Sequence, residues 1–478
     1  MIADKQKNAG GVVSGRPRGM PVRSREPVTL ESLYASETGD ILADAFPGKQ
    51  AMHGMAGAVP VPPQRTDALW KELMERPRSG PGVAYVHIPF CENHCLFCGF
   101  YQHAWRGDLG GSYVDTILEQ LRGHQDSPAH ASHPLRAVYL GGGTPTALSS
   151  RDIARLVEGL RAALPLAPDC EITLEGRILS FGAEKARAAF DAGVNRISIG
   201  VQTFDEPIRK RLGRKSTRAE TLRFLNTLVA LDRGAVVIDL IHGLPGQTPQ
   251  GFAEDAALAA RLGLDGVDLY SLSLIPGTPL LLAQEKGKLM TAPMRELGTY
   301  YAAGAEALDR AGWEAISCTH WRGGTRERNI YNFEVKSGAD CIALGAGAGG
   351  FLHGHAYRIP PDLSQYDEVA RQGGCLAAGF LAPSPLAAVH DAIKAGMERA
   401  RLDTARVVAA LRAATGDDFA AIAGPLLAQW TRAGLMRPRH DFLDLTLAGR
   451  FWQTAMTGRL MDWITQECSP KPTGDTAT

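Results

Sequence analysis

The sequence lacks an excess of charge of either sign, because its 478 residues contain 51 Lys and Arg and 51 Asp and Glu. A balanced chain offers no broad basic surface for nucleic acid or for an anionic membrane. It also lacks any apolar run near the ~20 residues that a membrane helix needs. The N-terminus has no apolar signal-peptide segment. We therefore expect a cytoplasmic protein without membrane insertion or nucleic-acid binding.

Cysteine is scarce, with 8 residues in the whole chain, yet three of them stand together in "CENHCLFC" at Cys91, Cys95 and Cys98. Thiols stay reduced in the cytoplasm, so this cluster favours metal binding over a disulfide. A closed zinc site needs a fourth ligand, which His94 or His103 could supply. An iron–sulfur cluster fits the spacing best. Three thiolates leave one iron of a four-iron cluster without a protein ligand, and that iron can take a substrate.

A strand–helix rhythm begins near residue 84. Six short runs rich in Val, Ile and Leu predict strands buried on both faces, at residues 84–90, 136–143, 170–177, 196–202, 235–245 and 267–276. Amphipathic or capped helical segments connect them. This alternation indicates parallel βαβ units, so we predict an α/β fold, an open or partly closed (β/α)6 barrel. A flat doubly wound sheet is the alternative that periodicity leaves open.

Polar residues and glycines recur where these strands end. They are Cys91, Gly141 to Thr144, Glu175, Gln202, Asp239 and Ser273. In a parallel α/β fold, the carboxyl ends of the strands meet at the edge where ligands bind. The sequence therefore predicts the functional site at that edge.

The rest of the chain divides by composition. Residues 1–80 are predicted to be an N-terminal extension whose first ~30 residues are disordered. Residues 81–370 form the barrel with an extension on the substrate side. Residues 380–465 resemble a small helical or winged-helix domain, and 466–478 a disordered tail. The C-terminal segment mixes Arg with Asp and lacks a basic stripe, so DNA binding is not expected there.

The cysteine spacing, an aromatic residue before the third cysteine and the later "GGGTP" together resemble the radical S-adenosylmethionine superfamily. The wider run "YVHIPFC…GGGTPT…RISIGVQTFD…DLIHGLPGQT" is similar to the branch containing oxygen-independent coproporphyrinogen dehydrogenase and heme chaperones. The resemblance implies a [4Fe–4S] cluster on Cys91, Cys95 and Cys98, and S-adenosylmethionine on its fourth iron. It places ten residues around this cofactor or a second copy of it: Tyr85, Phe97, Gly142, Gly143, Thr144, Glu175, Gln202, Arg214, Asp239 and Ser273.

The branches differ after the third cysteine. Coproporphyrinogen enzymes resemble C-G-C and heme chaperones C-D-F, whereas this chain has Gly99 and Phe100. "LEGRI" (174–178), "WEAISCTHWRGGTRERNIYNF" (313–333) and "ADAFPGKQAMHG" (43–54) resemble the anaerobic heme-degrading radical methyltransferases, the HutW/ChuW group. That resemblance implies methylation and opening of heme, with release of iron and a linear tetrapyrrole. The alternatives are a heme carrier of the same branch and a coproporphyrinogen III dehydrogenase.

The resemblance also implies partners and substrate contacts. A flavodoxin- or ferredoxin-type protein would supply electrons, and a heme-delivery or tetrapyrrole-reductase protein could act beside it. Within "THWRGGTRER", Arg322, Arg326 and Arg328 are candidates for the heme propionates, because Arg suits carboxylates. His320 is the candidate catalytic residue. A solvated basic loop and a structural histidine are the alternatives for this stretch.

Overall fold

A computed structural model describes residues 28–49, 57–107 and 109–468 of the chain. The disorder predicted for the first ~30 residues and for 466–478 lies outside these residues, apart from a few at each boundary. At those boundaries the prediction was wrong, because the Val28 amide donates to Gln466 Oε1 at 2.8 Å. The last helix, α17 (Leu447–Glu467), includes Gln466.

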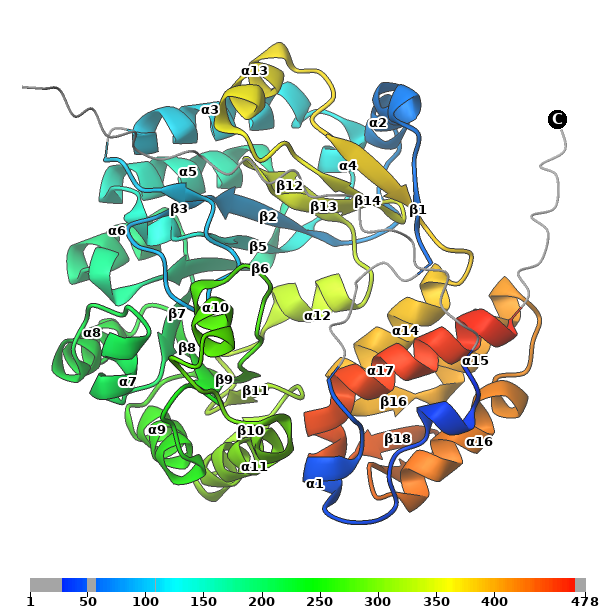
Figure 1. The fold of residues 1–478 in the computed structure, drawn as a ribbon. Coiled ribbons are helices and arrows are strands. Elements are labelled where there is room, and N and C mark those ends of the chain that lie inside the picture. Colours follow the sequence, from blue (N-terminus) through cyan, green and yellow to red (C-terminus); the bar gives the residue numbers. More distant parts are fainter. Residues whose placement is uncertain (1–27, 50–56, 108, 469–478) are drawn as a thin grey trace, which may run out of the picture.

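The six predicted strands form the parallel centre of one sheet. They are β2 (Gly82–Ile88), β5 (Leu135–Gly142), β6 (Leu166–Gly176), β7 (Arg196–Gln202), β8 (Ala235–His242) and β9 (Gly266–Ser271). Each pairs in parallel with the next in this order, so all six carboxyl ends lie at one edge (Figure 1). The α/β fold with parallel βαβ units is confirmed, and the described sheet is open.

Helices cover the outer face of this sheet. The main ones are α3 (Leu109–His124), α5 (Ser150–Ala163), α6 (Ala183–Ala192), α8 (Arg218–Leu231), α9 (Pro249–Arg261) and α11 (Met294–Arg310). Thr217 and Glu220 form the predicted capping box at the start of α8, which satisfies two backbone amides. Thr248 accepts a hydrogen bond from the Gly251 amide and caps α9. Local signals therefore fixed where these helices begin.

The two faces of each strand differ, as β7 illustrates. Ile197, Ile199 and Val201 are fully buried in the apolar core under the helices. Ser198 and Gly200 lie on the opposite face and line a cavity. Side chains alternate along a strand, so one face builds the core while the other carries polar groups into the barrel interior.

The sheet extends beyond the six strands on both sides to thirteen strands among the described residues. A seventh parallel strand, β12 (Cys341–Leu344), pairs with β2. Beyond it lie the antiparallel strands β13 (Gly349–Leu352), β14 (His355–Arg358), β15 (Gly379–Ala382) and β1 (Val59–Pro60). At the other edge, β11 (His320–Arg322) pairs antiparallel with β9, and β10 (Glu314–Ala315) pairs antiparallel with β11. The sequence predicted a loop where β11 forms.

The C-terminal elements follow the order expected of a winged helix. They are α14 (Ala387–Glu398), β16 (Arg401–Asp403), α15 (Thr404–Ala414), α16 (Phe419–Arg432), β17 (Met436–Arg439), β18 (Phe442–Leu445) and α17. The three strands pair in the order β16-β18-β17. Among the described helices, none combines the length and apolar character needed to cross a membrane.

The remaining short elements connect these layers. They include α1 (Ile41–Asp44), α2 (Thr66–Glu75), β3 (Phe90–Cys91), β4 (His103–Ala104), α4 (Pro128–Ala131), α7 (Glu206–Arg211), α10 (Pro279–Glu285), α12 (Ile330–Lys336) and α13 (Leu363–Gln372). Helix α12 lies between the barrel and the C-terminal elements (Figure 1).

The N-terminal segment around α1 packs on the C-terminal helices, as the blue ribbon beside α16 and α17 shows (Figure 1). The indole of Trp430 donates to Leu33 O at 3.3 Å. Gln429 donates to Ala35 O and accepts from the Ala35 amide, at 2.7 and 2.9 Å. A winged helix reads DNA with the helix that corresponds to α16. Gln429 and Trp430 are buried, so these contacts attach the N-terminal segment to the inner face of this helix.

We predict that Phe46→Ala lowers the free energy of unfolding by about 3–5 kcal/mol, the usual cost of emptying a buried aromatic site. Phe46 is 3% exposed and packs edge-on against Trp430 and Trp452. Urea titration followed by tryptophan fluorescence measures the change. Val59→Ala, at a side chain that is 62% exposed, is the control. Equal effects of the two changes would contradict the packing argument.

Candidate functional site

The three clustered cysteines lie on one loop that begins at β3. Cys91 and Cys95 are each 5% exposed and Cys98 is half-buried. The Cys98 amide donates to Cys95 O at 3.1 Å, which turns the loop back on itself. All three line a single cavity of about 290 Å³ at the carboxyl ends of the strands. The structure therefore gathers the predicted metal ligands at the predicted edge.

Seven of the ten predicted cofactor residues line the same cavity: Phe97, Gly143, Thr144, Glu175, Gln202, Arg214 and Asp239. They come from the cysteine loop, from the ends of β5, β6, β7 and β8, and from the segment after α7. Residues far apart in the sequence meet here because parallel strands end at one edge.

Three predicted cofactor residues do not line it. The Tyr85 hydroxyl lies 3.0 Å from His87 Nδ1, and its ring stacks on Tyr139. Gly142 precedes the cavity, with φ +108°, and a Cβ there would meet the His87 ring. Ser273 lies exposed beyond the end of β9. Strand register explains why Tyr85 lies outside the cavity. Tyr85 pairs with Tyr139, and Tyr139 pairs with Thr173, two residues before Glu175 on β6.

Two carboxyl groups face the cavity without a Lys or Arg within ion-pair distance among the described residues. Glu175 accepts from the Tyr139 hydroxyl at 2.6 Å and from the Gly142 amide at 3.3 Å. Burial raises the pKa of Glu175. Burial, Asp268 and Glu175 raise the pKa of Asp239 to about 7. A cationic ligand would favour the ionised forms of both groups, as a sulfonium or an ammonium does.

Two guanidinium groups approach Cys95, and the sequence predicted a role in the site only for Arg214. Arg177 Nη2 lies 3.0 Å from Cys95 Sγ and donates to Asn93 Oδ1 at 3.0 Å. Arg214 Nη1 lies 3.7 Å from the same sulfur. Both groups place positive charge beside this sulfur. The signal for Arg177 was present in "LEGRI", the stretch noted above, but no role was attached to its arginine.

The cavity keeps polar groups and backbone free for a ligand. Gln202 Oε1 and Arg214 Nε are buried and have no hydrogen-bond partner among the described residues. Gln202 also has φ +70°, a conformation that costs energy outside glycine and is common at functional sites. At Gly143, a Cβ would lie 2.7 Å from Phe90 O. The missing side chain thus lets this backbone pack closely against the segment that leads into the cysteine loop.

The donor set fits a four-iron cluster better than a single ion. Within the described part of the chain, no three His, Cys, Asp or Glu side chains converge as a single ion would require. A four-iron cluster needs no such convergence, because each thiolate binds a different iron. The thiol loop, the carboxyl groups and the unpaired polar atoms together fit a cluster with a cationic cofactor beside it.

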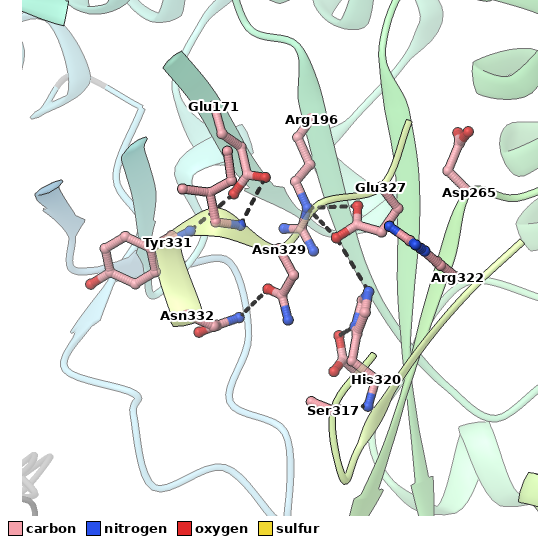
Figure 2. A network of polar contacts seen from close by, with 12 residues as sticks. Glu171, Arg196, Asp265, Ser317, His320, Arg322, Glu327, Asn329, Tyr331 and Asn332 are labelled. Carbon is pink, nitrogen blue, oxygen red and sulfur yellow. Dashed lines mark hydrogen bonds and ion pairs between the residues drawn. The ribbon is translucent and has the colours of Figure 1, made fainter. Parts of the chain in front are cut away.

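His320 is not among the residues that line the cavity and lies inside a buried ion network beside β9 (Figure 2). Its side chain is fully buried, with Nδ1 2.8 Å from Asp268 and Nε2 3.2 Å from Glu327. Glu327 also pairs with Arg196 at 2.9 Å. Burial opposes charge on His320, but Asp268 and Glu327 raise its pKa to about 9. Both ring nitrogens face carboxylates and His320 does not line the cavity, so its catalytic role stays a prediction.

The three predicted propionate ligands are also separated from the cavity. Arg322 donates to Glu314 Oε2 at 2.7 Å, Arg326 to Asp232 Oδ1 at 2.7 Å, and Arg328 to Asp169 Oδ2 at 2.9 Å. Arg322 pairs in the sheet with Gly266, the first residue of β9. These guanidinium groups thus lie at the amino ends of the strands and already hold carboxylates. All three candidates for the heme propionates therefore lie outside the lining of the cysteine cavity.

We predict that Cys95→Ala removes the iron–sulfur cluster while the protein stays folded, because one of three thiolates is lost. Iron and sulfide assays and the visible absorbance of anaerobically reconstituted protein measure this. Cys375→Ala is the matched control, since Cys375 lies outside the cavity. Full iron content in Cys95→Ala would show that the assignment is wrong.

We predict that S-adenosylmethionine binding tightens as pH rises through about 7, the pKa of Asp239. Below that pH the carboxyl is neutral, and above it the carboxylate attracts the cationic ligand. Below the pKa, the binding affinity should therefore fall by up to about tenfold for each unit of pH. Calorimetry between pH 6 and 8.5 measures the dependence. Asp239→Asn should weaken binding and flatten the profile, whereas Asp265→Asn, outside the cavity, should not.

Comparison with known proteins gives three findings. The Radical SAM superfamily model matches residues 85–259. Anaerobilin synthase of Escherichia coli O157:H7 is 42% identical over 421 residues, covering 88% of this chain and 93% of that protein. The heme chaperone HemW of Lactococcus lactis is 30% identical over 290 residues, 61% of this chain and 75% of the chaperone.

A solved structure shares the fold. Coproporphyrinogen III oxidase (HemN) from Escherichia coli aligns with a TM-score of 0.68 and 24% identity, over 82% of this chain and 92% of that one. The cysteine loop at the carboxyl edge and the sequence match along most of the chain point to the same family. The chain therefore belongs to the radical SAM superfamily, in the family that includes anaerobilin synthase.

Proposed function

We propose that this protein degrades heme without oxygen, by methylating and opening the porphyrin ring and releasing iron and a linear tetrapyrrole. One observation carries the proposal: three thiols of one loop and two half-buried carboxyl groups without an ion-pair partner among the described residues line the same cavity. The similarity to anaerobilin synthase along most of the chain supports the same reaction class.

Within this site, Cys91, Cys95 and Cys98 would hold a [4Fe–4S] cluster. Glu175 and Asp239 would bind the cationic part of S-adenosylmethionine. The cluster and this cofactor supply, on reduction, the carbon radical that starts the reaction. A second S-adenosylmethionine would provide the methyl group. The protein's own part is to orient these molecules and to exclude water.

Apolar side chains at the rim of the cavity offer a surface for the porphyrin. Phe100 and Tyr270 line the cavity and are 69% and 40% exposed. Leu274, 37% exposed, follows β9 at the same edge. Exposed apolar groups beside a polar cavity mark a binding surface, and heme is a large apolar disc. We propose that this rim holds the ring against the cofactor.

The partners in this proposal follow from the chemistry. A flavodoxin- or ferredoxin-type protein would reduce the cluster in the cytoplasm, and a heme-delivery or tetrapyrrole-reductase protein could act before or after the reaction. Two other functions stay as alternatives, a heme carrier and a coproporphyrinogen III dehydrogenase. The residues after Cys98 favour neither, because the chain has Gly99 and Phe100 there where those branches have cysteine or aspartate.

The proposal predicts that reconstituted protein bleaches the Soret band of heme under anaerobic conditions when S-adenosylmethionine and a reductant are present. Mass spectrometry should then find a metal-free tetrapyrrole that carries an added methyl-derived group. Heme that stays bound and unchanged would favour the carrier. Carbon dioxide release from coproporphyrinogen, with heme inert, would favour the dehydrogenase. Cys95→Ala is the inactive control, and Cys375→Ala should keep the activity of the unmodified protein.

A further inference from the structure

A large groove lies between the barrel and the C-terminal elements, separate from the cysteine cavity. Its volume is about 1010 Å³, and it shares no lining residue with that cavity. Glu314 of β10 and Ser337 after α12 form its barrel wall, while β16, β17 and β18 contribute the other wall. Glu314 pairs in the sheet with Arg322, opposite the start of β9. The groove therefore lies toward the amino ends of the strands.

Arginine dominates this groove. Six line it: Arg399, Arg401, Arg406, Arg437, Arg439 and Arg450. Three acidic residues line it as well, but each is already engaged. Asp444 holds Arg401 at 2.6 Å and Arg439 at 3.5 Å. Asp403 accepts from the backbone amide of Arg406, and Glu314 holds Arg322.

Four of the six guanidinium groups thus have no carboxylate partner among the described residues: Arg399, Arg406, Arg437 and Arg450. Arg450 Nε is also buried without a hydrogen-bond partner there. The segments outside the described residues offer no acidic surplus, since 1–27 is rich in arginine and 469–478 holds one Asp and one Lys. In a chain of zero net charge, this local excess fits an anionic ligand.

Aromatic rings in the groove narrow the class of that ligand. Phe333 of α12 lies 4.4 Å from the guanidinium of Arg399, and Phe442 of β18 lies 5.5 Å from that of Arg401. One ring belongs to each wall. The two rings add apolar surface to a groove whose exposed lining is mainly polar, and Arg binds carboxylates well. A flat apolar molecule with carboxylate groups satisfies both features.

A protein strand fits less well. Strand β17 is at the edge of its three-stranded sheet, but Pro438 stands in the middle of it. Proline removes a backbone donor and discourages pairing with an added strand. The N-terminal segment contacts Gln429 and Trp430 of α16, and duplex DNA is tested below as the other anionic ligand.

We propose that this groove is a second tetrapyrrole site, which binds heme or the opened product through its propionates, remote from the cluster. The proposal rests on the proposed function for the identity of the ligand. The groove would hold substrate before the reaction or product after it, so that the carboxyl edge of the barrel keeps one tetrapyrrole at a time.

The test is the stoichiometry of binding to cluster-loaded protein without reductant. Heme and biliverdin, a linear tetrapyrrole dicarboxylate, are titrated separately by absorbance. The double variant Arg406→Ser/Arg437→Ser removes two unpaired charges. Arg326→Ser/Arg328→Ser removes two charges that are paired outside the groove and is the matched control. We expect two sites in the unmodified protein and in the control, and at least about tenfold weaker binding at one site in the groove variant.

Comparison of heme with biliverdin shows which of the two tetrapyrroles the groove binds. Weakening for heme alone makes the groove a substrate site, and weakening for biliverdin alone makes it a product site. Biliverdin dimethyl ester, which lacks free carboxylates, should bind at one site fewer than biliverdin. Equal stoichiometry in the two variants, or an ester that binds as well as the acid, would overturn the proposal. Displacement of the second equivalent by duplex DNA at the same concentration would also overturn it.

A failure of the proposed function and a failure of the second site would give different results. If the unmodified protein leaves heme intact with S-adenosylmethionine and reductant, yet the groove variant alone loses one equivalent of bound heme, the second site stands and the reaction does not. If heme is opened at the normal rate and the groove variant binds like the control, the reaction stands and the second site does not.

Discussion

Parallel pairing of the central strands is the constraint on which the rest of the structure depends. Because β2 and β5 to β9 all run the same way, their carboxyl ends meet at one edge. Side chains alternate along each strand, so apolar residues pack under the helices while polar ones enter the barrel. Glu175 and Asp239 reach one cavity for this reason, although 64 positions separate them in the chain.

The same constraint creates a second, charged layer toward the opposite ends of the strands. Arg196 begins β7, Asp268 lies on β9 and His320 begins β11, and Glu327 joins them into one buried network (Figure 2). Buried charges are costly unless paired, and loss of one partner typically costs 3–5 kcal/mol. This network fixes the antiparallel edge of the sheet against β7. This network therefore stabilises the barrel, and through Asp268 it also raises the pKa of Asp239 in the cavity.

Charge balance in the whole chain conceals a local imbalance. Arg322, Arg326 and Arg328 each hold a carboxylate, so they are poor candidates for a further anion. Arg406 and Arg437 have no such partner among the described residues and line a groove. Two sets of arginines that look alike in the sequence thus differ in what they can bind, because only tertiary contacts decide which positive charges are already neutralised.

The sequence by itself determined the features that depend on short-range patterns. Strand composition and caps such as Thr217 with Glu220 predicted the βαβ order, and the spacing of Cys91, Cys95 and Cys98 predicted the cluster site. Polar residues at the strand ends predicted most of the cavity. What only the tertiary structure decided is which distant groups meet: that Arg177 lies on Cys95, that His320 is enclosed between two carboxylates, and that unpaired arginines gather in a groove. These facts depend on strand register and on packing between different segments of the chain, which no local pattern encodes.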